Sequence, residues 1–230
     1  MIPEKHFAVA VDGPSGAGKS TLAKAIAAKL GILYVDTGAI YRTIGYAVKR
    51  RGIEPRDEAA VRAILPELEI GMRYEADGEQ HMLLNGQDVT REIRLPEISM
   101  YASAVSALPS VRAFLLDAQR ALAKDNNVLM DGRDIGTVVL PGAQVKIFLT
   151  ASAGDRARRR YDELIARGEW VSYEQVLADV ERRDYNDTHR AAAPLRPAAD
   201  AVTVDTTGFT FDDAFALLLS TIRARLGQEG

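Results

Sequence analysis

Eight consecutive residues near the amino terminus, Gly13 to Ser20, have the spacing of a loop that binds phosphate groups. They read GPSGAGKS and directly follow the apolar run Phe7 to Val11, so the pattern predicts a strand, a glycine-rich loop and a helix in succession. Glycines suit such a loop because a polyphosphate must approach backbone N–H groups that a Cβ atom would cover. These N–H groups and the helix N-terminus supply positive partial charge. We interpret the segment as a nucleoside-triphosphate site rather than a chance glycine-rich turn.

Two side chains of this loop have the chemistry that phosphoryl transfer needs. Lys19 can bring a full positive charge to the β- and γ-phosphates, and the Ser20 hydroxyl can ligate Mg²⁺. We therefore expect Lys19 to be catalytic, Ser20 to be the metal ligand and Mg²⁺ to be the cofactor. The loop residues expected to contact the nucleotide are Gly13, Pro14, Ser15, Gly16, Ala17, Gly18, Lys19, Ser20 and Thr21.

Apolar runs and amphipathic segments alternate along the chain, which is typical of a parallel sheet with helices between its strands. The runs expected to form strands are Phe7 to Val11, Ile32 to Val35, Asn127 to Asp131, Val145 to Leu149 and Ala201 to Val204. The expected helices include Ser20 to Leu30, which Gly31 ends, and a last helix whose core stripe is Phe211, Phe215, Leu218, Ile222 and Leu226. We expect one α/β domain over residues 1–230, built on a three-layer parallel sheet.

A different pattern interrupts this alternation at residues 65–97. Apolar residues alternate from Leu68 to Tyr74, and the run Gln80 to Leu84 follows. Asn85-Gly86 predicts a tight turn after that run. We interpret residues 65–97 as a small antiparallel sheet inserted on the substrate side, although a surface elaboration would have the same pattern.

Two further polar clusters follow predicted strands, at the sheet edge where α/β proteins bind ligands. DTGAIYR spans Asp36 to Arg42, and DGRDIGT spans Asp131 to Thr137. A simpler interpretation of the first cluster is that Asp36 and Thr37 only cap a helix. Asp131 is placed to serve either the metal or a second substrate.

Arginines are concentrated in two later helices. The run from Arg156 to Arg160 is either a solvated helix face or part of a lid that closes over phosphates. Trp170, the only tryptophan, is interpreted as a packing residue. Arg183, Asp187 and Arg190 share one helix face by their spacing, where they form either a binding surface or a salt-bridge ladder.

The arginines of these clusters indicate a second anionic substrate. Arg42, Arg133, Arg183 and Arg190 have no evident task beyond neutralising negative charge. If the acceptor is a nucleoside monophosphate, its phosphate is already ionised near neutral pH, because its second pKa is about 6. No general base is then needed, and none of the histidines falls in an acid/base pattern. We expect catalysis by positioning, Mg²⁺ and arginine charges.

The motifs GPSGAGKS, DTGAIYR, DGRDIGT and RDYNDTHR, followed by AAAPL, occur in an order and spacing that resemble the bacterial cytidylate kinases. The resemblance runs from end to end and includes the stretch Ser103 to Arg112. It implies a P-loop nucleoside monophosphate kinase that transfers the γ-phosphoryl group of ATP to CMP or dCMP with Mg²⁺. The insertion at residues 65–97 would be the monophosphate-binding subdomain, and residues 152–170 the arginine-rich helical lid.

The resemblance also assigns roles to individual residues. Arg133, Arg159 and Arg190 would join Lys19 as catalytic residues, and Arg158 would contact ATP. Ser103, Arg112 and Asp134 would bind the base, whose N4 amino group suits a carboxylate acceptor. The residues implied to bind the acceptor are Thr37, Tyr41, Arg42, Ser103, Arg112, Asp131, Arg133, Asp134, Arg183, Asp187 and Arg190.

Two other kinds of protein share part of this pattern. A kinase of the same fold for uridylate, adenylate or a non-nucleotide acid would keep the loop and the arginines but change the base-binding set. A nucleotide-dependent switch protein would be expected to carry an Asn-Lys-x-Asp segment, which does not occur here.

Composition excludes some partners and locations. The formal net charge of −3 over 230 residues argues against a general nucleic-acid binder. The sequence contains no cysteine and no apolar stretch of membrane-spanning length. We expect a cytoplasmic monomer whose partners are ATP and CMP or dCMP, with no nucleic-acid or membrane partner.

Overall fold

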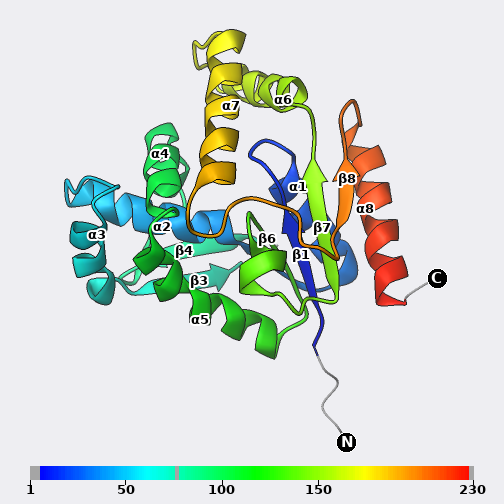
Figure 1. Ribbon diagram of the computed structural model, residues 1–230, viewed down its shortest axis with the longest axis horizontal. Coiled ribbons are helices and arrows are strands. Elements are labelled where there is room, and N and C mark those ends of the chain that lie inside the picture. The colour runs from blue at the N-terminus through cyan, green and yellow to red at the C-terminus, as the bar shows by residue number, and fades with distance from the viewer. Residues whose placement is uncertain (1–5, 76–77, 228–230) are drawn as a thin grey trace, which may run out of the picture. The chain divides into compact units, whose positions relative to one another are not determined.

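The computed structural model describes residues 6–75 and 78–227, which fall into two compact units (Figure 1). The first unit comprises Met1–Leu33 and Asn126–Gly230, and the second comprises Tyr34–Asp125. The phosphate loop and the arginine-rich helices belong to the first unit. The DTGAIYR cluster and the predicted insertion belong to the second.

The first unit is built on a sheet in which the strands follow the order β2-β6-β1-β7-β8. The first unit contains β1 (Ala8–Asp12), β6 (Val128–Gly132), β7 (Val145–Thr150) and β8 (Val202–Asp205), whereas β2 (Leu33–Asp36) begins in the first unit and continues into the second. β1 lies between β6 and β7, and β8 pairs with β7, all in parallel. Every residue of β1 and β6 is buried, which explains why these strands read as continuous apolar runs. The chain passes from the first unit to the second along β2.

The described part of the first unit has four α-helices, α1 (Lys19–Leu30), α6 (Ala153–Ala166), α7 (Tyr173–His189) and α8 (Phe211–Leu226), and a π-helical turn at Ile135–Val139. α1 and α8 contact each other and the sheet. Gly31 ends α1 as predicted, in the left-handed conformation with φ of 66°. α6 and α7 lie beyond the carboxyl end of β7 in Figure 1 and share a small core of Ala157, Leu164, Val176 and Val180.

Two expectations about apolar residues in this unit are wrong. Phe211 was expected in the core stripe of α8 but is 49% exposed, because the buried face of this helix follows Ala214, Leu218 and Ile222. Trp170 was expected to pack but is fully exposed in the turn between α6 and α7. Phe211 is the first residue of α8 and Trp170 lies between two helices, and at both places fewer neighbouring side chains surround the residue.

The second unit combines helices with a small antiparallel sheet of order β3-β4-β5. Its elements are α2 (Thr37–Arg50), α3 (Glu58–Ile64), β3 (Ile70–Tyr74), β4 (Gln80–Leu84), β5 (Gln87–Asp88), α4 (Pro96–Val105) and α5 (Pro109–Asp125). Single 3₁₀ turns occupy Leu65–Glu67 and Glu92–Arg94. Asn85 and Gly86 both have positive φ angles, of 50° and 77°, as the predicted tight turn requires.

α2 and α4 of the second unit pack closely against each other at Gly45 of α2. A Cβ atom at this position would lie 2.8 Å from the backbone nitrogen of Ala102 in α4. Glycine is therefore needed for α2 and α4 to pack at this distance, and the pair holds the residues on α2 at a fixed position relative to those on α4.

The predicted α/β class is confirmed: a parallel five-stranded sheet has flanking helices, and a separate three-stranded sheet is antiparallel. Among the described residues no single helix is long and apolar enough to cross a membrane. α4 and α5 reach that length and composition only as a pair, across a bend of 96°.

Candidate functional site

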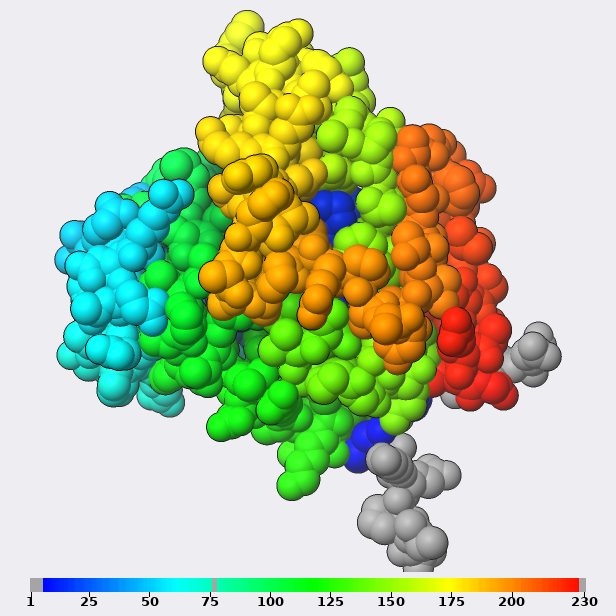
Figure 2. Space-filling view, in the orientation of Figure 1, coloured from blue at the N-terminus to red at the C-terminus, as the bar shows by residue number. Residues whose placement is uncertain are grey.

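The loop Gly13 to Ser20 connects β1 to α1 at the carboxyl edge of the sheet (Figure 1). At Gly13 a Cβ atom would lie 1.9 Å from the carbonyl oxygen of Leu149 in β7, so no side chain fits there. Gly16 and Gly18 have φ angles of 77° and 82°, which only glycine adopts readily. Such alternation of backbone conformation turns successive N–H groups to one side and forms a concave anion site. In Figure 2, blue atoms of the N-terminal segment lie at the bottom of a hollow between α6 and the orange segment after α7.

Lys19 lies at the start of α1, and its side chain is buried beneath this loop. Its Nζ donates a hydrogen bond to the carbonyl oxygen of Pro14 at 2.7 Å. Burial, followed by the positive charge of Arg133, lowers the pKa of Lys19 to about 7, against the opposing effect of Asp131 and Asp12. The ammonium group is therefore poorly compensated, and an anion in the loop would restore its charge.

Ser20 and Asp131 form the oxygen-rich part of the site. The Ser20 hydroxyl donates a hydrogen bond to Asp131 Oδ2 at 2.9 Å. Asp131 lies on β6 opposite Val11 of β1, and its side chain is buried. A hydroxyl and a carboxylate are hard oxygen ligands, which is the type that Mg²⁺ prefers. This donor set fits the metal that the sequence implies.

Asp12, the last residue of β1, was missed by the sequence analysis. Its buried carboxylate accepts hydrogen bonds from the backbone N–H groups of Ile135 and Gly136 at 2.7 and 2.8 Å. Burial raises the pKa of Asp12 to about 6, although these two hydrogen bonds oppose the shift. Ile135 and Gly136 begin the π-helical turn Ile135–Val139, which directly follows Arg133 and Asp134. The two hydrogen bonds of Asp12 therefore connect the strand before the phosphate loop to the segment that carries Arg133 and Asp134. The available sequence signal was a carboxylate at the end of an apolar strand.

The carboxyl end of α7 meets the DGRDIGT segment. Arg133 Nε donates to Asp187 Oδ2 at 2.9 Å. Nη2 of Arg190 lies 3.7 Å from Oδ1 of Asp134, and the side chains of this second pair are almost completely buried. The structure thus brings four of the predicted acceptor residues together in two ion pairs. Arg183 lies one turn before Asp187 on the same helix.

A strained residue positions Arg190. Ala193 has a φ angle of 49°, in the left-handed region that side chains rarely adopt, and its carbonyl oxygen accepts a hydrogen bond from Arg190 Nε at 2.7 Å. This turn aims the guanidinium of Arg190 toward Asp134. The sequence gives no signal for it, because alanine is not enriched at such positions.

The arginines of α6 have different surroundings. The guanidinium of Arg158 lies 4.5 Å from the ring centroid of Tyr173 and 5.5 Å from that of Tyr161. Arg159 donates to the carbonyl oxygen of Thr206 at 2.9 Å and lies 3.5 Å from that of Ala17 in the phosphate loop. Arg160 forms a surface ion pair with Glu163. Arg159, which was predicted to be catalytic, lies against the loop, whereas Arg158, which was predicted to contact ATP, lies over the tyrosine rings.

The remaining predicted residues lie in the second unit, on three helices. Asp36 caps α2 by accepting a hydrogen bond from the backbone N–H of Ala39, as the simpler interpretation expected, and Thr37 and Arg42 lie on the same helix. On α5 the guanidinium of Arg112 lies 5.7 Å from the ring centroid of Tyr41 on α2. Ser103 lies on α4. The structure therefore brings Tyr41 and Arg112 together.

Gln80 of β4 is a buried polar residue of the second unit that the sequence analysis did not identify. Its side-chain oxygen accepts from the backbone N–H of Asp36 at 2.8 Å, and its amide donates to the carbonyl oxygen of Asp36 at 3.3 Å. The Gln80 amide thus bonds to both backbone groups of Asp36, as a residue of a neighbouring strand would, and holds the start of α2 in place.

The environment of Lys19 leads to a prediction about pH. Above about pH 7 the free protein holds Lys19 largely neutral, whereas bound phosphates raise its pKa, so binding of ADP should take up a proton. Affinity should then fall by up to about tenfold per pH unit as the pH rises above 7. Isothermal titration calorimetry with ADP and Mg²⁺, in buffers of different ionisation enthalpy, measures both effects. Equal affinity at pH values of about 7 and about 9 would contradict the prediction, and Lys19→Met should abolish the proton uptake.

Known proteins resemble this chain over nearly its whole length. The sequence model of the cytidylate kinase family matches residues 9–224. A protein of Leuconostoc mesenteroides named cytidylate kinase is 49% identical over 218 residues, which cover 94% of this chain and 96% of that protein. A protein of the same name from Caldicellulosiruptor bescii is 47% identical over 215 residues, which cover 94% of this chain and 95% of that protein. The crystal structure of an uncharacterized protein from Eubacterium ventriosum, 11% identical, covers 96% of this chain and 99% of its own with a TM-score of 0.55, and supports the fold alone.

Proposed function

We propose, from the premise that the chain belongs to the cytidylate kinase family, that it transfers the γ-phosphoryl group of ATP to CMP or dCMP. The products are ADP and CDP or dCDP. The observation that carries this proposal is the extent of the family match, which runs from residue 9 to residue 224 and so includes both units rather than the phosphate loop alone.

The donor half of the proposed reaction uses the residues around the phosphate loop. Residues Gly13 to Thr21 hold the phosphates of ATP through their backbone N–H groups, except at Pro14, which has none, and Lys19 neutralises charge on the β- and γ-phosphates. Ser20 would hold Mg²⁺, and its hydrogen bond to Asp131 supports assigning Asp131 to the metal, through water, rather than to the acceptor. Mg²⁺ when bound neutralises charge on the transferring group. Arg159 lies beside the loop and adds a positive charge there. Arg158 would contact the nucleotide if the lid at residues 152–170 closes.

The acceptor half uses the two ion pairs and the second unit. We assign Arg133 and Arg190, with Arg42, to the acceptor phosphate, and Arg183 and Asp187 to its sugar. The ionised phosphate attacks the γ-phosphorus in line and ADP leaves with the bridging oxygen, so no protein base is needed. Thr37, Tyr41, Ser103, Arg112 and Asp134 would hold the cytidine, and residues 65–97 would belong to the monophosphate-binding subdomain. The expected cytoplasmic location and monomeric state stay predictions.

A panel of acceptors tests the proposed function. ADP release from ATP and Mg²⁺ is measured with CMP, dCMP, UMP, AMP, GMP or shikimate, beside a control without acceptor. Rapid turnover with the cytidine nucleotides alone supports the proposal. Preference for another acceptor would overturn the base-binding assignments, and ADP release that no acceptor stimulates would overturn the kinase reaction.

Asp134 provides a prediction about selectivity. Asp134→Ala should lower the preference for CMP over UMP by about ten- to a hundredfold, because a carboxylate that accepts from the N4 amino group is lost. The affinity for ATP should change much less. Ratios of kcat/KM for CMP and UMP measure the effect, with Asp117→Ala on the exposed face of α5 as the matched control. An equal loss for both acceptors would show that Asp134 does not read the base, since its contact with Arg190 then accounts for the whole effect.

A further inference from the structure

Arg156, in the first turn of α6, is almost completely buried, with 4% of its surface exposed. The run from Arg156 to Arg160 was interpreted either as a solvated face or as a lid, and for Arg156 the solvated alternative is wrong. Its guanidinium donates to the carbonyl oxygens of Ala151 at 2.8 Å and Ser15 at 3.0 Å. It also donates to both carboxylate oxygens of Asp184, at 2.9 and 2.5 Å. Four of its five N–H donors are thus engaged, and they connect the end of β7, the phosphate loop and α7.

The bond to Ser15 determines the orientation of one peptide group in the phosphate loop. In a trans peptide the carbonyl of one residue and the N–H of the next point in opposite directions, and no cis peptide occurs among the described residues. Since the Ser15 carbonyl points toward Arg156, the N–H of Gly16 points away from it, toward the concave side of the loop. Arg156 therefore presents one of the backbone donors that an anion in the loop would use.

Packing and a second arginine support this interpretation. A Cβ atom on Gly16 would lie 3.2 Å from Cβ of Arg156, so the arginine stem lies directly against the loop. Two residues further on, the carbonyl of Ala17 is directed toward Arg159 at 3.5 Å, which turns the N–H of Gly18 the opposite way. Alternate carbonyls of the loop are thus held from the same helix, as the left-handed φ angles of Gly16 and Gly18 require.

Asp184 makes the role of Arg156 geometric rather than electrostatic. Its carboxylate pairs bidentately with the guanidinium and neutralises it, so Arg156 adds little net attraction for phosphate. Asp184 lies three residues before Asp187 on α7, and Asp187 pairs with Arg133. At Asp184, α7 is therefore connected to the phosphate loop through Arg156, and about one turn later, at Asp187, it is connected to the DGRDIGT segment through Arg133.

We propose that Arg156, held by Asp184, is a positioning residue that keeps the phosphate loop in its anion-binding conformation before the nucleotide arrives. The proposal rests on the proposed function in that the anion is the polyphosphate of ATP. It adds that a residue whose guanidinium is bonded to protein groups, at Ala151, Ser15 and Asp184, sets the affinity of the loop for ATP. Because the loop is pre-organised, binding does not have to reorder its backbone.

The test measures binding of ADP and of tripolyphosphate by calorimetry, without acceptor, to the wild-type protein and to Arg156→Lys. Lysine keeps the charge but cannot reach the carbonyls of Ala151 and Ser15 and both oxygens of Asp184 at once. We expect both ligands to bind about ten- to a hundredfold more weakly, by the same factor, because the defect lies in the loop that holds their phosphates. Asp184→Asn, which retains one carbonyl acceptor, should give a smaller loss in the same direction.

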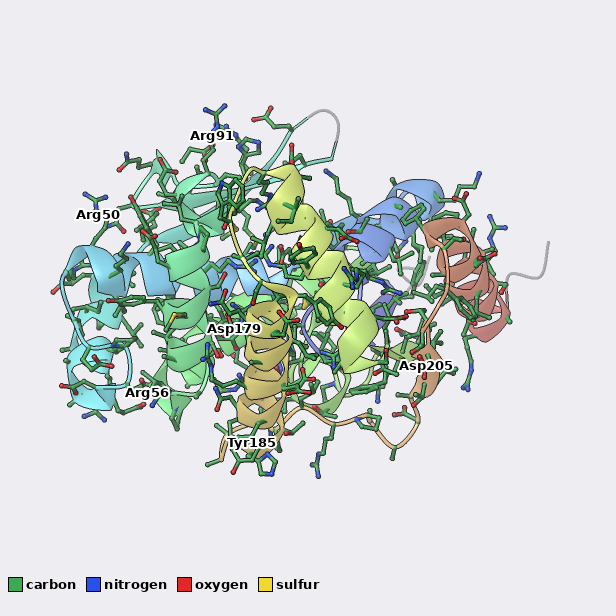
Figure 3. All side chains as sticks on the ribbon, turned by 90° about the horizontal axis from the view of Figure 1, so that it is seen from above. Arg50, Arg56, Arg91, Asp179, Tyr185 and Asp205 are labelled. Atoms are coloured by element: carbon green, nitrogen blue, oxygen red, sulfur yellow. The ribbon has the colours of Figure 1, made fainter. Side chains whose placement is uncertain are left out.

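The matched controls are Arg182→Lys and Asp179→Asn, an exposed ion pair on α7 (Asp179 is labelled in Figure 3). They should leave both affinities unchanged. A purely structural role for Arg156 would lower the unfolding temperature of Arg156→Lys and Asp184→Asn but leave their affinities, measured well below that temperature, at the wild-type value. That result would overturn the proposal. Failure of the wild-type protein to bind ADP would instead overturn the proposed function.

Discussion

Replacing Lys19 by methionine is expected to reduce kcat by at least about a thousandfold while leaving the protein folded. Removal of one uncharged donor from an oxyanion site costs about 10²–10³ in kcat, and this substitution also removes a full positive charge. Methionine is of similar length and apolar, so it fills the buried space of the Lys19 stem. The unfolding temperature should stay the same or rise, because a buried ammonium with a lowered pKa opposes folding.

Steady-state kinetics with ATP and CMP, together with a thermal melt, measure both quantities. Lys29→Met, at an exposed position in the last turn of the same helix, is the matched control and should retain full activity. If Lys19→Met kept more than about a tenth of kcat, charge neutralisation by this residue would not be a main source of catalysis.

Replacing Arg133 by methionine is expected to have the second large effect, a loss of about 10³-fold or more in kcat/KM for CMP. Burial disfavours the charge of Arg133, but the carboxylates of Asp187, Asp131 and Asp12 raise its pKa above the ordinary value, so it stays protonated. Asp187 fixes the guanidinium through Nε, and Nη1 donates to the carbonyl oxygen of Gly132 at 3.4 Å, so the guanidinium is held in one orientation. Arg133→Lys retains a charge without that orientation and should recover part of the activity.

Initial rates over a range of CMP concentrations distinguish these variants. The control is Arg223→Met on the exposed face of α8. If Arg133→Met lost affinity for ADP and left the kinetics with CMP unchanged, the assignment of Arg133 to the acceptor would be refuted. If Arg133→Lys were as inactive as Arg133→Met, the orientation held by Asp187 would matter more than the charge.

The phosphate loop, the order of strands and helices, and the antiparallel character of β3 to β5 could be predicted from the residues. These features depend on neighbours in sequence: the glycines of GPSGAGKS permit the loop, apolar runs form the buried strands, and Gly31 ends α1 because glycine adopts a left-handed conformation. The three polar clusters could be found for the same reason, since each directly follows a predicted strand.

The contacts that hold the site together could not be predicted, because they join residues far apart in the chain. Asp12 meets Ile135 and Gly136, and Arg156 meets Ser15 and Asp184, through hydrogen bonds that span 28 to 141 residues. A buried guanidinium and a solvated one look alike in a run of arginines, and the difference is the desolvation that only packing against the loop and α7 imposes. Short motifs in the sequence thus identify the residue types that can carry out the chemistry. The direction in which each donor points depends instead on which distant segments of the chain pack beside it.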